Sequence, residues 1–285
     1  MSEGAERQPR GGATPLALLA AAHPGPALVV TATATVLAVV LDADTSTAVL
    51  VALAFAAGQL SIGWSNDWID AARDTATSRA DKPVARGDVP ARRVASAAIA
   101  AAVATVPLSF ALGFLAGFAN LVAVAAGWAY NLGLKSTVWS WAPYAVAFGL
   151  LPAVVMLALP GHPWPPVWLL AVGALLGTGA HLANVLPDLE EDRATGVRGL
   201  PHRLGRTWTS LLAPALLVAG SALALLGPPG AAPGLAVPVL LGSVVLAVGA
   251  GVAALAGQRF LPLAAIGAIA IVDLVLLVVS APPPA

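Results

Sequence analysis

Apolar residues gather along the chain in nine segments, each long enough to cross a lipid bilayer as a helix. A bilayer-spanning helix needs about 20 mostly apolar residues. No segment shows the ten-residue alternation of apolar and polar positions that membrane β-strands require. The pattern therefore predicts an all-α membrane protein. The predicted spans are residues 25–42, 46–66, 91–113, 116–135, 139–160, 165–187, 206–227, 234–256 and 261–281.

Composition supports a membrane protein. The chain has 285 residues, of which 59% are hydrophobic and 10% are charged, whereas soluble domains carry about 25% charged residues. The formal net charge is zero, so charge gives no reason to expect a nucleic-acid partner, and none is predicted. The chain contains no cysteine, which excludes disulfides and thiolate metal sites.

The spans form a single predicted transmembrane domain over residues 15–281. We expect residues 1–14 to be a disordered cytoplasmic tail and residues 282–285 to be a short tail. Two connections between spans are unusually polar, at residues 67–93 and 188–206. These two connections are where polar chemistry would take place.

The basic residues predict the orientation. All 14 Lys and Arg residues lie in the N-terminal tail or around the connections after spans 2, 4, 6 and 8. Cytoplasmic connections are the ones that carry an excess of Lys and Arg. We therefore expect a multi-pass protein of the cell membrane, with the N-terminus and both polar connections in the cytoplasm and the C-terminus outside.

One acidic motif occurs twice, as "NDWIDAARD" at residues 66–74 and "NVLPDLEED" at residues 184–192. Each copy ends an apolar span, and four spans separate them, so both emerge on the same membrane face. This predicts two pseudo-repeated, parallel halves plus a ninth helix. The matching residues, at a constant offset of 118, are Asn66, Asp70 and Asp74 in the first copy and Asn184, Asp188 and Asp192 in the second.

The spacing of each motif predicts a shared helix face. Residues four apart rotate by about 40° per step, so the three side chains would line one face over about 12 Å. Two such helix ends facing each other would surround a small volume with carboxylates and amides. Oxygen ligands of this kind suit Mg²⁺, which also keeps waters and binds phosphate oxygens. Zinc is disfavoured because neither motif contains His, and His181 is interpreted as an ordinary helix histidine.

Basic residues near the motifs supply partners for a diphosphate. Carboxylates for Mg²⁺ combined with Lys and Arg for oxyanions are the groups that hold such a ligand. A single acidic triplet could equally be a solvated helix end, but two matched copies on one face argue for a site. The basic residues are Arg73, Arg79, Lys82 and Arg86 after the first motif, Arg193, Arg198 and Arg203 after the second, and Lys135 at the end of span 4.

These residues resemble the UbiA superfamily of intramembrane prenyltransferases, and the resemblance covers nearly the whole chain. The family's first motif is Asn-Asp-x-x-Asp-x-x-x-Asp, followed by Arg-x-x-Lys-Pro-x-x-x-Gly, and its second is Asp-x-x-x-Asp with a following Gly. A Tyr and a Lys at the end of span 4 are also typical. The matching residues are Asn66, Asp67, Asp70, Asp74, Arg79, Lys82, Pro83, Gly87, Tyr130, Lys135, Asp188, Asp192 and Gly196.

The resemblance implies a ring of nine helices around a central cavity, with Mg²⁺ bridging the motifs to the diphosphate of an isoprenyl donor. The prenyl group would lie in the cavity and pass to an aromatic or other lipophilic acceptor. Catalysis would fall to Asp70, Asp74, Asp188 and Asp192. The metal ligands would be these four with Asn66, Asp67 and Asn184, and the diphosphate would contact Arg79, Lys82, Lys135, Arg193 and Arg198.

The substrate pocket is expected to include Trp64, Trp68, Tyr130 and His23. Aromatic faces can stabilise the allylic cation that forms when the diphosphate leaves. His23 and Pro24 stand where many family members carry an Arg-Pro pair. Without that fixed positive charge, a carboxylated aromatic acceptor is less strongly implied.

Three other functions are compatible with parts of the pattern. A terpene cyclase on the same scaffold would ionise the same donor and capture the cation with the donor's own double bonds. A transporter would need an acid at membrane depth, and Asp273 is the one candidate. A purely structural membrane protein is the least favoured, because it gives no reason for two matched acidic motifs.

Overall fold

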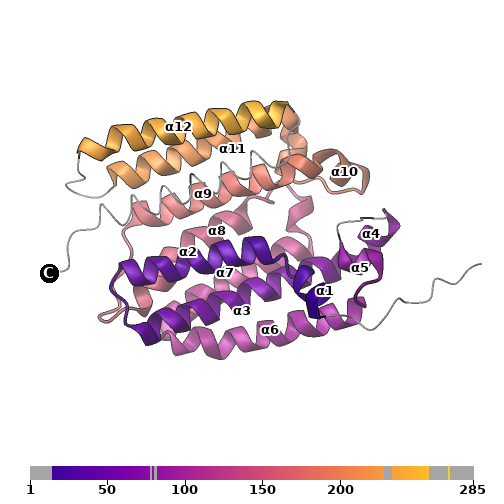
Figure 1. Cartoon of the computed structure of the whole chain (residues 1–285), viewed down its shortest axis with the longest axis horizontal. Helices are drawn as coiled ribbons and strands as arrows, with labels where there is room; N and C mark the ends of the chain where they lie inside the picture. The colour runs from indigo at the N-terminus through magenta and orange to yellow at the C-terminus, as the bar shows by residue number, and fades with distance from the viewer. Residues whose placement is uncertain (1–14, 78, 80–81, 228–232, 257–268, 270–285) are drawn as a thin grey trace, which may run out of the picture.

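The computed structural model describes residues 15–77, 79, 82–227, 233–256 and 269. All regular elements within these residues are helical, and Figure 1 shows the long helices running side by side. The long helices are α2 (Pro24–Val40), α3 (Thr45–Ile69), α6 (Ala91–Ala111), α7 (Phe114–Leu132), α8 (Ala142–Ala158), α9 (Val167–Val185), α11 (Leu200–Leu226) and α12 (Pro233–Leu255).

Each of the first eight predicted spans corresponds to one long helix. Five helices among the described residues, α3, α6, α7, α9 with its continuation, and α11, are long and apolar enough to cross a membrane, and three shorter apolar helices accompany them. The chain is therefore a multi-pass, all-helical membrane protein. Apart from Ile269, the ninth predicted span lies outside the described residues, as do Asp273 and both predicted tails. The count of nine therefore stays a prediction.

Apolar side chains cover the outside of the helices and also fill much of the interior, where some polar groups are buried among them. Large apolar side chains such as Leu28, Val103 and Phe118 are exposed, as expected for surfaces that face lipid. Between helices, Asn120 of α7 donates to the Ser109 hydroxyl of α6 at 2.8 Å. Lipid tails are as apolar as these side chains, so contacts of this kind, with close packing, hold membrane helices together.

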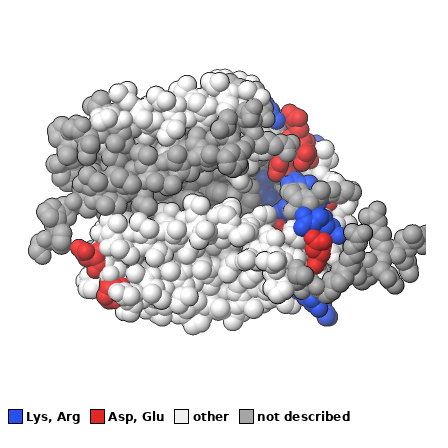
Figure 2. Space-filling model, in the orientation of Figure 1, with Lys and Arg blue, Asp and Glu red and all other residues white. Residues whose placement is uncertain are grey.

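The polar connections lie together at one end of the long helices (Figure 1). Most of the charged side chains visible in Figure 2 gather at this end. The first polar connection begins later than predicted, because α3 continues through Ile69. Short elements fill this end of the molecule: α1 (Pro15–Ala20), α4 (Ala71–Ala76), α5 (Pro83–Arg86), α10 (Leu189–Ala194) and the 3-10 turns η1 (Leu134–Ser136) and η2 (Leu186–Asp188).

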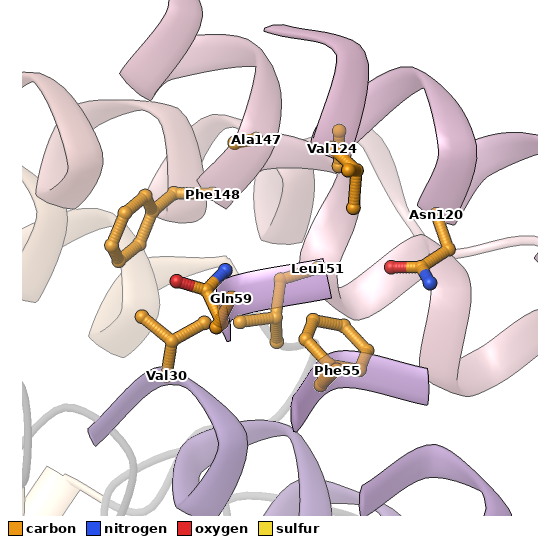
Figure 3. A pocket seen from close by; sticks show the side chains of 9 residues that line it. Val30, Phe55, Gln59, Asn120, Val124, Ala147, Phe148 and Leu151 are labelled. Atoms are coloured by element: carbon orange, nitrogen blue, oxygen red, sulfur yellow. The ribbon is translucent and has the colours of Figure 1, made fainter. Parts of the chain in front are cut away.

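A small cavity of about 20 Å³ lies among α2, α3, α7 and α8. Most of its lining is apolar, with the amides of Gln59 and Asn120 as exceptions (Figure 3). Gln59 precedes Asn66 by two turns of α3, or about 10 Å. The cavity thus lies deeper among the helices than the charged end. The lining residues are Val30, Phe55, Gln59, Asn120, Ala123, Val124, Ala147, Phe148 and Leu151.

Candidate active site

The first acidic motif spans the junction of α3 and α4. Asp70 lies between the two helices with a nearly helical backbone (φ −83°, ψ −4°). Its N–H donates to the Asn66 carbonyl at 3.0 Å, and the Asp74 N–H donates to the Asp70 carbonyl at 2.9 Å. The helical ladder therefore continues through the junction. The Asn66 amide donates to the Asp70 carboxylate at 3.3 Å, so these two side chains lie on one face.

The second motif does not lie along one straight helix, and this part of the prediction is wrong. Asn184 belongs to α9, Asp188 to η2 and Asp192 to α10. Pro187 lies within η2, and a proline has no N–H to donate to the preceding turn. A 3-10 turn therefore interrupts the regular α-helix within the second motif.

Arg79 joins the two motifs across the charged end. Its guanidinium lies 3.3 Å from an Asp188 oxygen and 3.8 Å from a Glu191 oxygen. Tyr130 of α7 lies close enough to Asp70 and Asp192 for both carboxylates to act on it electrostatically. Segments more than 100 residues apart in the chain therefore meet in one polar region, as the repeated motif predicts.

Asp70 lies among cations. The Lys135 ammonium lies 2.5 Å from both carboxylate oxygens, and the Arg73 guanidinium lies 2.9 Å from one of them. Asp70 is only 6% exposed, and a buried carboxylate needs such partners. Lys135 and Arg73 thus compensate the charge at the centre of the first motif.

Asp67 has different partners from the rest of the motif. Its Oδ1 atom accepts from the Lys82 ammonium at 2.7 Å and lies 2.8 Å from His23 Nε2. Lys82 also donates to the Asn66 amide oxygen at 3.3 Å. Asp67 therefore ties α3 to the beginnings of α2 and α5, and Asn66 shares Lys82 with it.

Burial shifts the pKa values of two groups at the charged end. Burial raises the pKa of Asp74 above its ordinary value, although the charges of Lys82 and Arg73 oppose the shift. Burial lowers the pKa of Lys135, against the opposing charge of Asp70. The Oδ2 atoms of Asp74 and Asp67 are buried and have no hydrogen-bond partner. Burial therefore disfavours the charged forms of Asp74 and Lys135, and two carboxylate oxygens of the first motif are unpartnered.

The second motif is more exposed and lies near further basic residues. His202 Nε2 lies 3.4 Å from an Asp192 oxygen, and Arg193 donates to the His202 carbonyl. Arg206 pairs with Glu190 at 3.3 Å. Arg198 is exposed, and its carbonyl accepts from Arg203.

The predicted aromatic residues fall into two groups. Trp64 and Trp68 pack against a small cluster that includes Val89 and Val94, and the Trp64 indole donates to the Leu18 carbonyl at 2.8 Å. Tyr130 belongs to a separate group, in which its ring meets those of Tyr144 and His181 nearly edge-on at 5.3 and 5.6 Å.

Two polar residues near the site were missed from the sequence. Asn131 is buried, accepts from the Asn66 amide at 3.2 Å and donates to the Ser65 hydroxyl at 2.8 Å. Ser140 is buried and lies 3.1 Å from His181 Nε2. Their closeness to Lys135 in the sequence is the signal that could have indicated them. Asn131 precedes Lys135 by one helical turn, and Ser140 follows Lys135 in the same connection.

The residues of this region fit a hard cation held jointly with phosphate oxygens. Among the described residues, no three Asp, Glu or His side chains converge closely enough to hold a metal alone. Mg²⁺ commonly takes only one or two carboxylates and completes its shell with water and substrate phosphate. The unpartnered Asp74 oxygen and the nearby carboxylates and amides are ligands of the right chemistry.

Known proteins resemble this chain in both sequence and fold. The chain is 32% identical over 169 residues to a bacteriochlorophyll synthase 33 kDa chain from Cereibacter sphaeroides, covering 52% of each chain. It thus spans about half the length of the curated relatives it matches.

Solved structures share the fold at low sequence identity. A UbiA homologue from Archaeoglobus fulgidus, bound to DMAPP and Mg²⁺, aligns with a TM-score of 0.68 at 17% identity, over 91% of this chain and 98% of the other. An apo UbiA homologue from Aeropyrum pernix aligns with a TM-score of 0.73 at 17% identity, over 89% of this chain and 97% of the other.

The UbiA prenyltransferase family itself matches residues 27–272. The matched region contains both acidic motifs, and the chain belongs to the UbiA prenyltransferase family.

Proposed function

We propose that the protein is a Mg²⁺-dependent intramembrane prenyltransferase. It transfers an isoprenyl group from an isoprenyl diphosphate to an aromatic or other lipophilic acceptor. The observation that carries the proposal is the meeting of the two acidic motifs, with Lys and Arg between them, at one end of a bundle of apolar helices. The Archaeoglobus fulgidus homologue, which was solved with DMAPP and Mg²⁺, supports the same ligands.

The proposed metal ligands come from both motifs. Bound Mg²⁺ supplies Lewis-acid stabilisation of the charge that builds on the departing diphosphate. Asp74 and Asp67 of the first motif each have a buried Oδ2 atom without a hydrogen-bond partner, which a cation could use. The full proposed set is Asn66, Asp67, Asp70, Asp74, Asn184, Asp188 and Asp192, with Asp67 the weakest member because its Oδ1 atom already contacts Lys82 and His23.

The proposed diphosphate contacts are cations that now pair with carboxylates. Lys135 contacts Asp70, Lys82 contacts Asp67, and Arg79 contacts Asp188. An incoming diphosphate and metal would let these cations exchange carboxylate oxygens for phosphate oxygens, which bind Lys and Arg strongly. Arg193 and Arg198, which follow Asp192 of the second motif in the sequence, complete the proposed set of diphosphate contacts.

The reaction follows from this arrangement. The donor's C–O bond breaks, its electron pair leaves with the diphosphate, and Lys and Arg stabilise the developing charge because they are already in place. The acceptor then forms the new bond to the allylic carbon and loses a proton. Trp64, Trp68 and Tyr130 are proposed to lie near the cation, and His23 near the acceptor. The prenyl tail would extend towards the apolar cavity, which must widen, since it now measures only about 20 Å³.

Substrate turnover tests the proposal. Purified protein in lipid nanodiscs would be incubated with labelled geranyl, farnesyl and geranylgeranyl diphosphates, with and without Mg²⁺, and with lipid-soluble phenols as acceptors. We expect Mg²⁺-dependent formation of a prenylated acceptor. A cyclic hydrocarbon or alcohol formed without acceptor would identify a terpene cyclase instead. No consumption of any donor would contradict both.

A further inference from the structure

Ser140 is fully buried in the connection between η1 and α8, where three segments meet. Its hydroxyl oxygen accepts from the Leu200 N–H at the start of α11, at 2.9 Å. The same oxygen lies 3.1 Å from Nε2 of His181 in α9. The hydroxyl proton finds a partner when Ser140 donates to His181. Ser140 therefore links this connection to both α9 and α11.

Gly199 brings the start of α11 against the same connection. Its backbone (φ −65°, ψ 179°) is one that any residue can adopt. A side-chain Cβ here would lie only 2.5 Å from the Lys135 carbonyl oxygen and 2.8 Å from the Ser140 hydroxyl. Glycine is therefore needed for the close approach and not for its conformational freedom.

Lys135 connects this contact to the first acidic motif. Its backbone carbonyl faces Gly199, while its ammonium lies 2.5 Å from both Asp70 oxygens. The preceding residue pair, Gly133 and Leu134, begins a 3-10 turn after α7 ends. A short turn with few hydrogen bonds of its own depends on outside contacts to fix its position. Gly199 and Ser140 supply these contacts.

We propose that Gly199, Ser140 and His181 are positioning residues that hold Lys135 in place beside Asp70 for binding the diphosphate. This inference rests on the proposed function, in which Lys135 contacts the diphosphate. His181 precedes Asn184 by about one turn of α9, so the same network connects Lys135 to the helix that carries Asn184 of the second motif. Residues of the second half of the chain, Gly199 and His181, thereby fix the position of Lys135, which contacts Asp70 of the first motif.

The test measures the affinity for inorganic pyrophosphate in the presence of Mg²⁺, by isothermal titration calorimetry. Gly199→Ala is expected to weaken binding about tenfold, the loss of one charge-assisted contact. Ser140→Ala, which fits without steric conflict, should weaken it in the same direction. Gly242→Ala in α12 is the matched control, because an added Cβ there meets nothing within 4 Å.

A double-mutant cycle separates positioning from general destabilisation. If Gly199 acts through Lys135, Gly199→Ala should cause no further loss of affinity in a Lys135→Gln background. Losses that multiply, or unchanged affinity in both Gly199→Ala and Ser140→Ala, would overturn the inference. His181→Gln, whose amide oxygen can accept from Ser140, should retain more affinity than His181→Phe, and equal affinities would count against the role of His181. Failure of the wild-type protein to bind Mg²⁺-pyrophosphate would instead contradict the proposed function.

Discussion

Asp67 differs from the other acidic residues of its motif because it stabilises the fold through contacts with Lys82 and His23. It is 1% exposed, and its Oδ1 atom lies within 2.8 Å of both Lys82 and His23. Removing one member of a buried ion pair leaves an uncompensated charge. We therefore expect Asp67→Asn to lower the free energy of unfolding by about 3 kcal/mol, as measured by chemical denaturation in detergent.

The same variant should change the metal requirement less than Asp70→Asn does. Asp67 is the weakest of the proposed metal ligands, because its Oδ1 atom contacts Lys82 and His23. The Mg²⁺ concentration for half-maximal turnover is therefore expected to rise more in Asp70→Asn than in Asp67→Asn. An equal or larger rise in Asp67→Asn would make Asp67 a principal metal ligand.

Asp74 should make the metal-free protein less stable as the pH rises. Burial raises its pKa in the folded state above the ordinary value of 3.8, so the folded protein holds this proton more tightly than the unfolded chain. Stability therefore falls as pH increases from the unfolded pKa through the higher folded pKa. In thermal melts without metal, Asp74→Asn should be more stable than wild type at neutral pH, with the difference vanishing near pH ~4. A difference that grows towards acidic pH would contradict this.

Most of the predicted site residues follow from sequence because their spacing repeats. Asn66, Asp70 and Asp74 are distinguished by a second copy at a fixed offset, which a solvated helix end would not need. The partners of these residues are less predictable. Asn131 and Ser140 contact the site through side-chain geometry between helices, and an isolated Asn or Ser in an apolar run carries no such information.

Close approach of helices depends on a few glycines. Gly173 and Gly177 of α9 face the backbone of α8, where a Cβ would lie 2.3 and 2.6 Å from carbonyl oxygens, as their four-residue spacing predicts. Gly113, which also has a glycine four residues later at Gly117, has a different role from Gly173 and Gly177. It is a turn residue with φ 104° that precedes α7, a conformation that favours glycine.

Gly63 makes the corresponding contact beside the site. A Cβ on this residue of α3 would lie 2.0 Å from the Ala22 carbonyl oxygen, next to His23. Gly63→Ala should therefore force α3 away from the start of α2 and destabilise the protein by about 1–3 kcal/mol, measured by thermal unfolding. Gly249→Ala, with open space around its added Cβ, is the control, and equal stabilities of the two variants would show that the contact is not constraining.

The sequence predicts the long helices better than it predicts the short elements that follow them. Long apolar runs predict the long helices, because burial in lipid demands both length and apolarity. These are α2, α3, α6, α7, α8, α9, α11 and α12. The short elements of the polar connections, such as α4 and α10, bury little apolar surface and show no such pattern. The second motif contains a 3-10 turn that includes Pro187. The proline is visible in the sequence, but the regular spacing of the acids predicts a continuous helix instead.

Most of the charged side chains visible in Figure 2 lie at one end of the molecule, and we propose that this end faces the cytoplasm. The cysteine-free chain makes this simple to test. Single cysteines would be introduced at exposed positions, Ala194→Cys beside the site and Pro163→Cys at the opposite connection. In intact cells, a membrane-impermeant maleimide should label Pro163→Cys and spare Ala194→Cys. The reverse labelling would invert the orientation.

The central claim is that the two acidic motifs act as one site for Mg²⁺ and diphosphate. Its most direct test is the rate of diphosphate release, at saturating Mg²⁺, from the donor that the wild-type protein consumes fastest. Asp70→Asn and Asp192→Asn should each lower this rate about a hundredfold or more. The rate of the double variant should be little lower than that of the less active single variant, because the effects of groups that act as a unit are not additive. A wild-type rate in either single variant, in protein that folds normally, would contradict the claim.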